Sequence, residues 1–409
     1  MKKVISYIAI LLGAALLVFA IALPTYVVPK GKVLPLDVVS TTPTEEKKGD
    51  LLDSAALAAE RPVKGKENAP ECKAKDKPVS CFIAVGVPLK SQRFTVAQEP
   101  SDKKKVTLEV GNTLVRTDMK EPHNLLSATI DRVTLDRETQ MPVPEPISTF
   151  DPTPPSAGKK KDGDNVPAFA RDGIQYQWPM GTDRKSYDYF DVQILKSQPI
   201  DFVKEEEMSG EKTYLFQQEV KPTAIEPNLR KYLESDGELS ESDKATLSPL
   251  KLKFPAKKWG LTPEEVPGWH PQGSHGGEGD GQEGPDATSD EGPDVEMTRY
   301  YTVNRRINVE PETGVIVNGS EDVWMFYARD DKEAQKIATE GRDEELKNPK
   351  RTAMYFPGEW NDEARANQMF KAKEGLSTLK MMGTILPWTL GIAGLLLLVV
   401  GFMLHRERR

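Results

Sequence analysis

Residues 297–330 read MTRYYTVNRRINVEPETGVIVNGSEDVWMFYARD, and this stretch decides the fold class. Tyr, Val, Ile, Trp and Phe recur between short turn signals, and such side chains favour the pleated, half-buried surface of a sheet. One turn is expected at Pro311-Glu312-Thr313-Gly314 and a second at Asn318-Gly319, where glycine tolerates the positive φ of a tight hairpin. The stretch therefore predicts an antiparallel meander of three strands.

Further strand signals precede this meander. β-branched and aromatic residues alternate or cluster between turn residues in the segments CFIAVGV, KVTLEVGNTLVRTD, SATIDRVTLDRET, GIQYQWP, YDYFDVQIL and KTYLFQQEV. Together they predict a mainly β (α+β) domain over residues 24–380, folded as a large antiparallel barrel or sandwich. Two smaller domains divided at 141–167 are the alternative. We prefer one closed unit, because both ends of the domain lead into apolar runs.

Three segments interrupt the strand pattern. Residues 39–80 are rich in Lys, Glu and Pro, and residues 141–167 are rich in Pro, Gly and charge. Residues 270–295 are acidic and Gly-rich, with too few large apolar side chains to bury. We expect loops or disordered insertions in all three, apart from a short helix over Leu51–Glu60 capped by Asp50.

Both ends of the chain carry long uncharged apolar runs, residues 4–23 and 381–404. Each has the ~20 residues that a helix needs to cross a bilayer. The short tails 1–3 and 405–409 are basic, so the positive-inside rule places both in the cytoplasm and the domain outside the plasma membrane. A cleaved signal peptide is the alternative for the first run, because its Ala-Ile-Ala motif resembles a cleavage site.

The segment between the first run and the domain reads LPTYVVPKGKVLPLDV, residues 23–38. We expect Pro24 to end the membrane helix, and Tyr26 to lie at the interface where aromatic side chains are favoured. The remainder is expected to continue as an extended strand beside the helix that leads into the second run. That helix, DEARANQMFKAKEGLSTLK, is capped by Asn361.

Composition limits the partners. Five of the 55 basic and one of the 63 acidic residues lie in the tails, which leaves the outer segment with a net charge of about −12. This balance argues against nucleic acid as a partner, because phosphate binding needs clustered Lys and Arg. Cys72 and Cys81 both lie in the outer segment and predict a disulfide, since no histidine lies near either for a metal site or a catalytic pair.

No sequence motif assigns a catalytic centre. The four histidines lack a recognised catalytic frame, and the sequence has no nucleophile elbow, phosphate loop or metal-binding pattern. We therefore predict a non-enzymatic protein with no catalytic residues, metal or cofactor. A glycan-active enzyme with a pair of carboxylates is the alternative, because carboxylates are abundant in the sequence.

Aromatic residues cluster in two parts of the strand pattern. In a strand, alternate members of each cluster face the same side. Packing in the core is the simpler interpretation, and a groove or tunnel for a lipid chain or a sugar is the more specific one. The candidate lining residues are Tyr176, Trp178, Tyr187, Tyr189, Phe190, Tyr300, Tyr301, Trp324, Phe326 and Tyr327.

Two segments, WPMGTDRKSYDYFDVQ (178–193) and PIDFVKEEEMSGEKTYLFQQEV (199–220), resemble the core of the actinobacterial PorA family of membrane proteins. The segments ALPTYVVPKGKVLPLDVVSTT and LPWTLGIAGLLLLVVGFML fit the same family. The resemblance implies a double-anchored plasma-membrane protein, with its domain in the periplasm-like space of a mycolate-bearing actinobacterium. It also implies a part in cell-envelope assembly, namely maturation of lipomannan and synthesis of lipoarabinomannan.

Three non-enzymatic functions are compatible with this resemblance. The leading hypothesis is a protein that binds a lipid or lipid-linked glycan and presents it to membrane glycosyltransferases. The second is a scaffold that only holds such enzymes. The third is a porin, as the family name implies, although a membrane barrel needs strands with a lipid-facing apolar band and this chain has two helical anchors. The architecture is also similar to that of class B scavenger receptors, whose outer domain carries a lipid tunnel.

Overall fold

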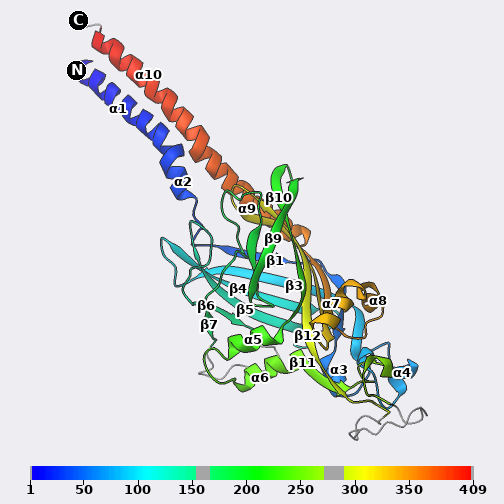
Figure 1. Cartoon of the computed structure of the whole chain (residues 1–409). Helices are drawn as coiled ribbons and strands as arrows, with labels where there is room; N and C mark the ends of the chain where they lie inside the picture. Colours follow the sequence, from blue (N-terminus) through cyan, green and yellow to red (C-terminus); the bar gives the residue numbers. More distant parts are fainter. Residues whose placement is uncertain (1, 153–165, 271–289, 407–409) are drawn as a thin grey trace.

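The computed structural model describes residues 2–152, 166–270 and 290–406. A helical stem projects from a sheet domain, and both chain ends lie at the far end of the stem (Figure 1). The first arm of the stem comprises α1 (Lys2–Ala22), the π-helical turn η1 (Leu23–Val27) and α2 (Val28–Gly31). The second arm comprises α9 (Asp362–Lys380), the π-helical turn η6 (Met381–Ile385) and α10 (Leu386–Arg406).

Each arm is long and apolar enough to cross a membrane, as the sequence predicts. The two arms pack through small residues. A Cβ atom on Gly394 would stand 2.9 Å from the carbonyl oxygen of Gly13, so the helices can approach this closely only through glycine. Ser6 Oγ donates a hydrogen bond of 2.8 Å to the carbonyl oxygen of Gly401. Such contacts are typical of helices that associate in lipid.

The expectation that Pro24 ends the first helix is wrong. The helical backbone continues to Gly31, so the expected extended strand after Pro24 is absent there. Pro24 lies in the wider turn η1, and Thr25 Oγ1 donates a hydrogen bond of 2.6 Å to the carbonyl oxygen of Ile21. A π-helical turn together with a threonine hydroxyl satisfies backbone groups that a proline leaves unpaired in a membrane helix.

The segment after Pro24 does pack against the second arm, but it does so as a helix and the contact is with η6, where the Val28 side chain lies 3.9 Å from the position of a Cβ on Gly383. One expectation for the stem is confirmed. Asn361 caps α9, because its side-chain oxygen accepts a hydrogen bond of 2.8 Å from the backbone N–H of Ala364. From Asp362 to Arg406 the second arm is one continuous helix.

In the described part of the chain, the domain is built on one large antiparallel sheet of 14 strands. The strands are β1 (Val39–Pro43), β2 (Lys47–Leu52), β3 (Ile83–Gln98), β4 (Lys105–Arg116), β5 (Leu125–Asp136), β6 (Ser148–Asp151), β7 (Ala168–Phe169), β8 (Tyr187–Asp191), β9 (Lys196–Met208), β10 (Glu211–Ala224), β11 (Lys251–Pro255), β12 (Asp294–Glu310), β13 (Val315–Ala328) and β14 (Thr352–Glu359). Their order is β7-β6-β5-β4-β3-β2-β14-β13-β12-β10-β9-β8, with β1 beside β3 and β11 beside β12. The strands on either side of 141–167 therefore belong to the same sheet.

The expectation of an insertion over residues 39–80 is wrong. This segment contains β1 and β2, and β2 lies in the middle of the sheet between β3 and β14. Asp50 belongs to β2, where its Oδ1 accepts a hydrogen bond of 2.9 Å from the backbone N–H of Gly86. The short helix begins later, at Ser54, and Asp53 is its cap. A central strand can therefore have a polar sequence, because hydrogen bonds to the neighbouring strands and one buried carboxylate hold it in place.

The other two expected insertions fall partly outside the described residues. The described part of 141–167 contains β6, and residues 153–165 lie outside it. Residues 271–289 of the acidic, Gly-rich segment also lie outside the described part of the chain.

The predicted meander contains two strands, β12 and β13. The turn at 311–314 is confirmed, and Gly314 adopts a φ of 68°. The second predicted turn is wrong, because Asn318-Gly319 lies inside β13. A Cβ on Gly319 would stand 3.2 Å from the indole of Trp360, so glycine here allows an aromatic ring to approach the strand.

The sheet curls until its two edges meet. The strands β7 and β8 are the first and the last in the strand order. Even so, the rings of Phe169 on β7 and Phe190 on β8 lie only 5.9 Å apart. Ile174, just after β7, forms an isolated parallel bridge with Tyr189 of β8. The α+β class is confirmed. The ladder between the two edge strands remains open, so the domain is a curled open sheet in place of the expected barrel or sandwich.

Short helices cover the sheet on both faces. The outer face of β13 packs against α7 (Asp331–Thr339) through Trp324 and Phe326. On the inner face, α5 (Glu226–Leu233) and η4 (Ser248–Leu250) pack against Tyr301 and Val303, at the end of the domain away from the stem (Figure 1). The other helices among the described residues are α3 (Ser54–Ala58), α4 (Pro70–Lys73), η2 (Val79–Phe82), α6 (Glu241–Leu247), η5 (Pro263–Glu265) and α8 (Arg342–Lys347).

Candidate functional site

The inner face of the curled sheet carries a network of buried charged side chains. Arg305 of β12 lies at one wall of this network. Its Nη2 donates to Asp191 Oδ2 at 3.0 Å, and its Nε donates to Glu321 Oε1 at 2.6 Å. Its Nη1 donates to the side-chain oxygen of Gln218. The side chains of Arg305 and Asp191 are 6% and 1% exposed, so this one guanidinium joins β8, β10 and β13 in the interior.

Asp131 of β5 organises the opposite wall. Arg171 Nη1 donates to both carboxylate oxygens of Asp131, at 2.9 and 2.8 Å, and the Tyr176 hydroxyl donates to the same carboxylate. The guanidinium carbon of Arg171 lies 4.1 Å from the ring centroid of Phe190 on β8. Both members of the Arg171–Asp131 pair are buried. This wall therefore connects β5 to the opposite edge of the sheet.

Arg93 of β3 links the two walls. Its Nε donates to Asn112 Oδ1 at 3.1 Å, and its guanidinium carbon lies 5.6 Å from the ring centroid of Tyr176. Burial opposes the charge of Arg93, but the Glu321 carboxylate and the Tyr189 and Tyr176 hydroxyls favour it, so the pKa of Arg93 is raised. Because Tyr176 contacts Asp131 and Glu321 contacts Arg305, the charged side chains form one continuous network.

Burial and neighbouring charges fix the protonation states in this network. Burial, followed by the Asp131 carboxylate, raises the pKa of Tyr176 well above its usual value. Burial and Asp191 do the same for the pKa of Tyr301. Burial would raise the pKa of Glu321, but the charges of Arg305 and Arg93 lower it overall. The tyrosines therefore stay protonated donors, while Glu321 stays ionised.

The network balances its charges. Three guanidinium groups face three carboxylates, namely those of Arg93, Arg171 and Arg305 against those of Asp131, Asp191 and Glu321. Buried ion pairs give little net stability relative to apolar side chains of similar size. The six charged groups therefore make this interior a candidate functional site.

Part of the network can be reached by water. The Glu321 side chain is 34% exposed, and Arg93 and Asn112 are half-buried. In Arg171, the buried Nε and Nη2 donate to no residue in the described part of the chain. These two N–H groups can therefore donate further hydrogen bonds to a polar ligand.

Apolar side chains continue the same face beyond Glu321. Val323 and Met325 follow Glu321 on β13 at alternate positions, and Met325 pairs with Met354 of β14. All three apolar side chains are only half-buried. The inner face is therefore amphipathic, with a charged level next to an apolar level whose side chains are partly buried against the core.

The structure distributes the ten predicted aromatic residues over several clusters. All except Tyr176 and Tyr187 are buried. Three of them pack together on the outer side of β12 and β13, namely Tyr300, Trp324 and Phe326. Trp178, Tyr187 and Tyr189 form part of another cluster. Tyr301 packs below α5, and Tyr327 packs near the disulfide.

These ten residues therefore do not line one groove. Tyr176, Tyr189 and Tyr301 contact the charged network, and Phe190 lies under Arg171. Whether any of the ten contacts a ligand stays a prediction. The charged members of the network were missed from the sequence. The sequence does contain one signal for Arg305. It stands between Val303 and Ile307 at alternate positions of a strand, so all three side chains are expected to point to the same, inner face.

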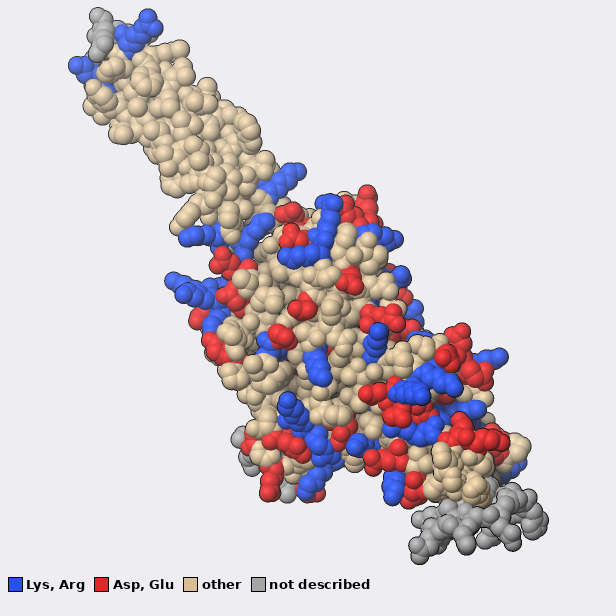
Figure 2. All heavy atoms as spheres, viewed as in Figure 1, with Lys and Arg blue, Asp and Glu red and all other residues tan. Residues whose placement is uncertain are grey.

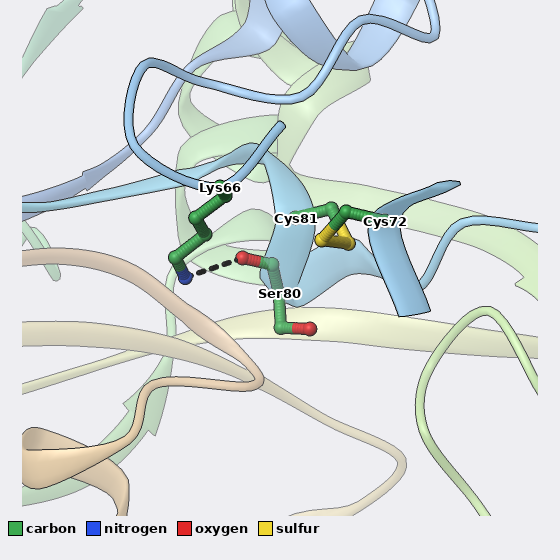
Figure 3. The surroundings of a disulfide bond; sticks show 4 residues. All are labelled: Lys66, Cys72, Ser80 and Cys81. Carbon is green, nitrogen blue, oxygen red and sulfur yellow. Dashed lines mark hydrogen bonds between the residues drawn. A yellow bond between two sulfur atoms is a disulfide. The ribbon is translucent and has the colours of Figure 1, made fainter. Parts of the chain in front are cut away.

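The predicted disulfide between Cys72 and Cys81 is present, with the Cα atoms 5.6 Å apart. It ties α4 to η2, and Lys66 Nζ donates a hydrogen bond of 2.6 Å to the carbonyl oxygen of Ser80 beside it (Figure 3). Both sulfurs are buried in a cluster with Trp259. No group of histidine, cysteine or carboxylate side chains in the described part of the chain could hold a metal ion.

Comparison with known proteins identifies relatives over the full chain. The family model described as Porin PorA matches residues 5–403. A protein named Porin PorA from Corynebacterium resistens is 58% identical over 410 residues, which cover 100% of this chain and 98% of the relative. A second Porin PorA, from Corynebacterium amycolatum, is 43% identical over 415 residues and the full length of both chains. These names describe a porin and no enzyme. The chain belongs to the PorA family.

Proposed function

We propose that this protein is a membrane-anchored envelope protein whose curled sheet gives a lipid or lipid-linked glycan a path along its inner face. The observation that carries the proposal is the amphipathic inner face. The charged level around Glu321 and Arg93 suits a polar head group, and the half-buried Met325 and Met354 suit an apolar chain. A molecule with both parts would contact both levels.

The surface of the molecule supports anchoring by the stem. Figure 2 shows Lys, Arg, Asp and Glu spread over the sheet domain, and a stem without them between its two ends. We propose that the stem crosses the plasma membrane with both termini in the cytoplasm, because the charged residues at the tip of the stem are basic. The domain then lies in the periplasm-like space, next to the outer leaflet.

The sequence resemblance to the PorA family is what suggests a class of ligand. We propose that the bound molecule is an intermediate of lipomannan or lipoarabinomannan assembly, and that membrane glycosyltransferases receive it. An acidic outer segment with local charge of both signs agrees with protein and glycan partners more than with nucleic acid.

A pore is the second candidate function, because the relatives are named porins. Within one copy, Ser6–Gly401 and the contact between Gly13 and Gly394 close the space between the two helices. Ion flow across a bilayer would therefore need several stems arranged around a common axis. Recordings from planar bilayers that contain the purified full-length protein test this candidate directly.

Native mass spectrometry of the protein, purified in mild detergent from its own host, tests the first proposal. We expect a lipid or lipoglycan at one copy per chain, and we expect Met325→Trp to displace it by filling the apolar level. Met119→Trp is the matched control, because Met119 is 40% exposed outside the inner face.

The two candidates predict different results. A ligand-free native protein that conducts ions in planar bilayers would replace the first proposal with the pore. A ligand-free, non-conducting protein that is recovered with glycosyltransferases would leave a scaffold.

A further inference from the structure

We propose that Lys30 and Lys380, at the end of the stem next to the domain, form a binding site for the phosphate groups of anionic lipids. Charge is scarce in this part of the chain. Lys30 and Lys32 are the only charged residues in 4–36, and Lys380 is the only one in 375–404. Every charge on the apolar part of the stem is therefore positive.

The two lysines lie at the same height on the stem. Val28 of the first arm faces Gly383 of the second, and the two arms run in opposite directions. Lys30 stands two residues beyond Val28 toward the domain, and Lys380 stands three residues beyond Gly383 in the same direction. With a helical rise of 1.5 Å per residue, their heights agree within about 2 Å.

This height corresponds to the head-group layer of a membrane. Tyr26 and Trp388 are 60% and 70% exposed, and aromatic side chains on both arms mark the interface. Lys30 lies one helical turn beyond Tyr26, which is roughly 5 Å along the stem and comparable to the thickness of a head-group layer.

Contacts within the stem orient one of these ammonium groups toward the interface. Lys30 Nζ donates a hydrogen bond of 3.0 Å to the Tyr26 hydroxyl, and it lies 4.4 Å from the centroid of the Tyr26 ring. The long side chain therefore folds back toward the membrane instead of extending toward the domain. A phosphate oxygen in the head-group layer would lie beside it.

Both ammonium groups are available for a ligand. Lys30 and Lys380 are exposed, and neither forms an ion pair with a carboxylate in the described part of the chain. Neighbouring lysines differ, because Lys32 pairs with Glu312 at 3.5 Å and Lys373 pairs with Glu211 at 3.9 Å. Figure 2 shows basic side chains where the stem meets the domain. The free charges therefore belong to the two lysines that lie at head-group height.

Such a site would hold the domain at a fixed height over the membrane. A lysine close to an anionic membrane surface strengthens binding roughly fivefold, so two lysines give roughly thirtyfold. The inference rests on the stem crossing a membrane, and it is independent of any ligand on the inner face.

Native mass spectrometry of the full-length protein in detergent, titrated with phosphatidylglycerol or with phosphatidylcholine, tests the site. We expect the native protein to bind phosphatidylglycerol more tightly than phosphatidylcholine. Lys30→Gln/Lys380→Gln should weaken phosphatidylglycerol binding roughly thirtyfold and remove the preference. Lys30→Arg/Lys380→Arg should keep it, because the charge is retained.

The control variant is Lys332→Gln/Lys336→Gln, which removes two exposed lysines from α7 on the domain. It changes the net charge equally and should leave the lipid preference unchanged. An equal loss in this control, or an unchanged preference in Lys30→Gln/Lys380→Gln, would overturn the proposal. Circular dichroism checks the fold of each variant, and Met325→Trp separates the site from lipid held on the inner face.

Discussion

The stem and the inner face of the sheet bring together segments from opposite ends of the sequence, and they do so with opposite chemistry. In the stem, Gly13 faces Gly394 without any charged side chain between the arms. On the inner face, the single guanidinium of Arg305 donates hydrogen bonds to Asp191, Gln218 and Glu321. Lipid excludes charge from the stem, whereas strands that enclose their own interior can hold it when each charge has a partner.

The largest expected effect is the loss of one charge from the inner face. Arg305→Leu leaves Asp191 and Glu321 without their shared partner, so it should lower the free energy of unfolding by about 3–5 kcal/mol. Denaturant titration monitored by tryptophan fluorescence measures this. Arg306→Leu is the matched control, because the next residue on β12 is exposed, and its effect should stay below ~1 kcal/mol. Equal effects of the two variants would contradict a special role for the inner face.

The second largest effect is expected at low pH, where an ion-pair cluster on the outer face should stop stabilising the fold. Burial would raise the pKa of Glu333, but its hydrogen bond from Arg329 and the charge of Arg351 lower it to about 2 from the usual 4.5. A folded-state pKa below the unfolded value stabilises the fold above about pH 5, and this stabilisation is lost as the pH falls toward 2. The loss should reach roughly 3 kcal/mol.

Thermal unfolding at pH 7 and pH 3 measures this contribution. Glu333→Gln cannot ionise, so its unfolding temperature should change less between the two pH values. The same change in the native protein and the variant would show that Glu333 does not control this part of the acid response.

A smaller effect is expected in the stem. Gly394→Leu places a side chain against the Gly13 carbonyl oxygen and Leu17, and overpacking of this kind costs about 1–3 kcal/mol. Gly391→Leu is the control, because its nearest neighbour across the stem, Ala20 Cβ, lies 3.8 Å from a Cβ position. Cysteine cross-linking between the arms should fall in Gly394→Leu and persist in Gly391→Leu. Unchanged cross-linking in both would show that the arms do not depend on this contact.

The smallest effect is expected for an ion pair on the outer face of β5. Arg132 donates to Glu109 at 2.6 and 2.9 Å, and their side chains are 48% and 30% exposed. Arg132→Gln should cost less than ~1 kcal/mol, because exposed pairs are screened by water and salt. Its neighbour Asp131 is buried on the inner face, so Asp131→Asn should cost clearly more in the same thermal assay. Similar losses would remove the distinction between the two faces.

The sequence predicted the local features that one short segment determines. The apolar arms, the cap at Asn361, the turn at 311–314 and the Cys72–Cys81 disulfide all follow from residue type and spacing. The predictions failed where a residue pattern that is typical of a local turn is explained by packing against a distant residue. Asn318-Gly319 reads as a turn, but the glycine makes room for Trp360.

Central strand β2 shows the same limit. Its sequence, KKGDLL, is polar, and only its neighbours β3 and β14 make it a strand. β-propensity depends on context, so a segment held by ladder hydrogen bonds on both sides can carry a sequence that reads as a loop.

By itself, the sequence determined the two apolar arms, the β-rich class and the absence of a recognised catalytic motif, because periodicity and composition are local properties. Only the tertiary structure decided that the sheet curls until β7 meets β8, and that Arg93, Asp131 and Arg305 share one interior. These charges come from strands separated by up to two hundred residues. Strand alternation shows which way each side chain points, but only the order and curvature of the strands place those side chains together.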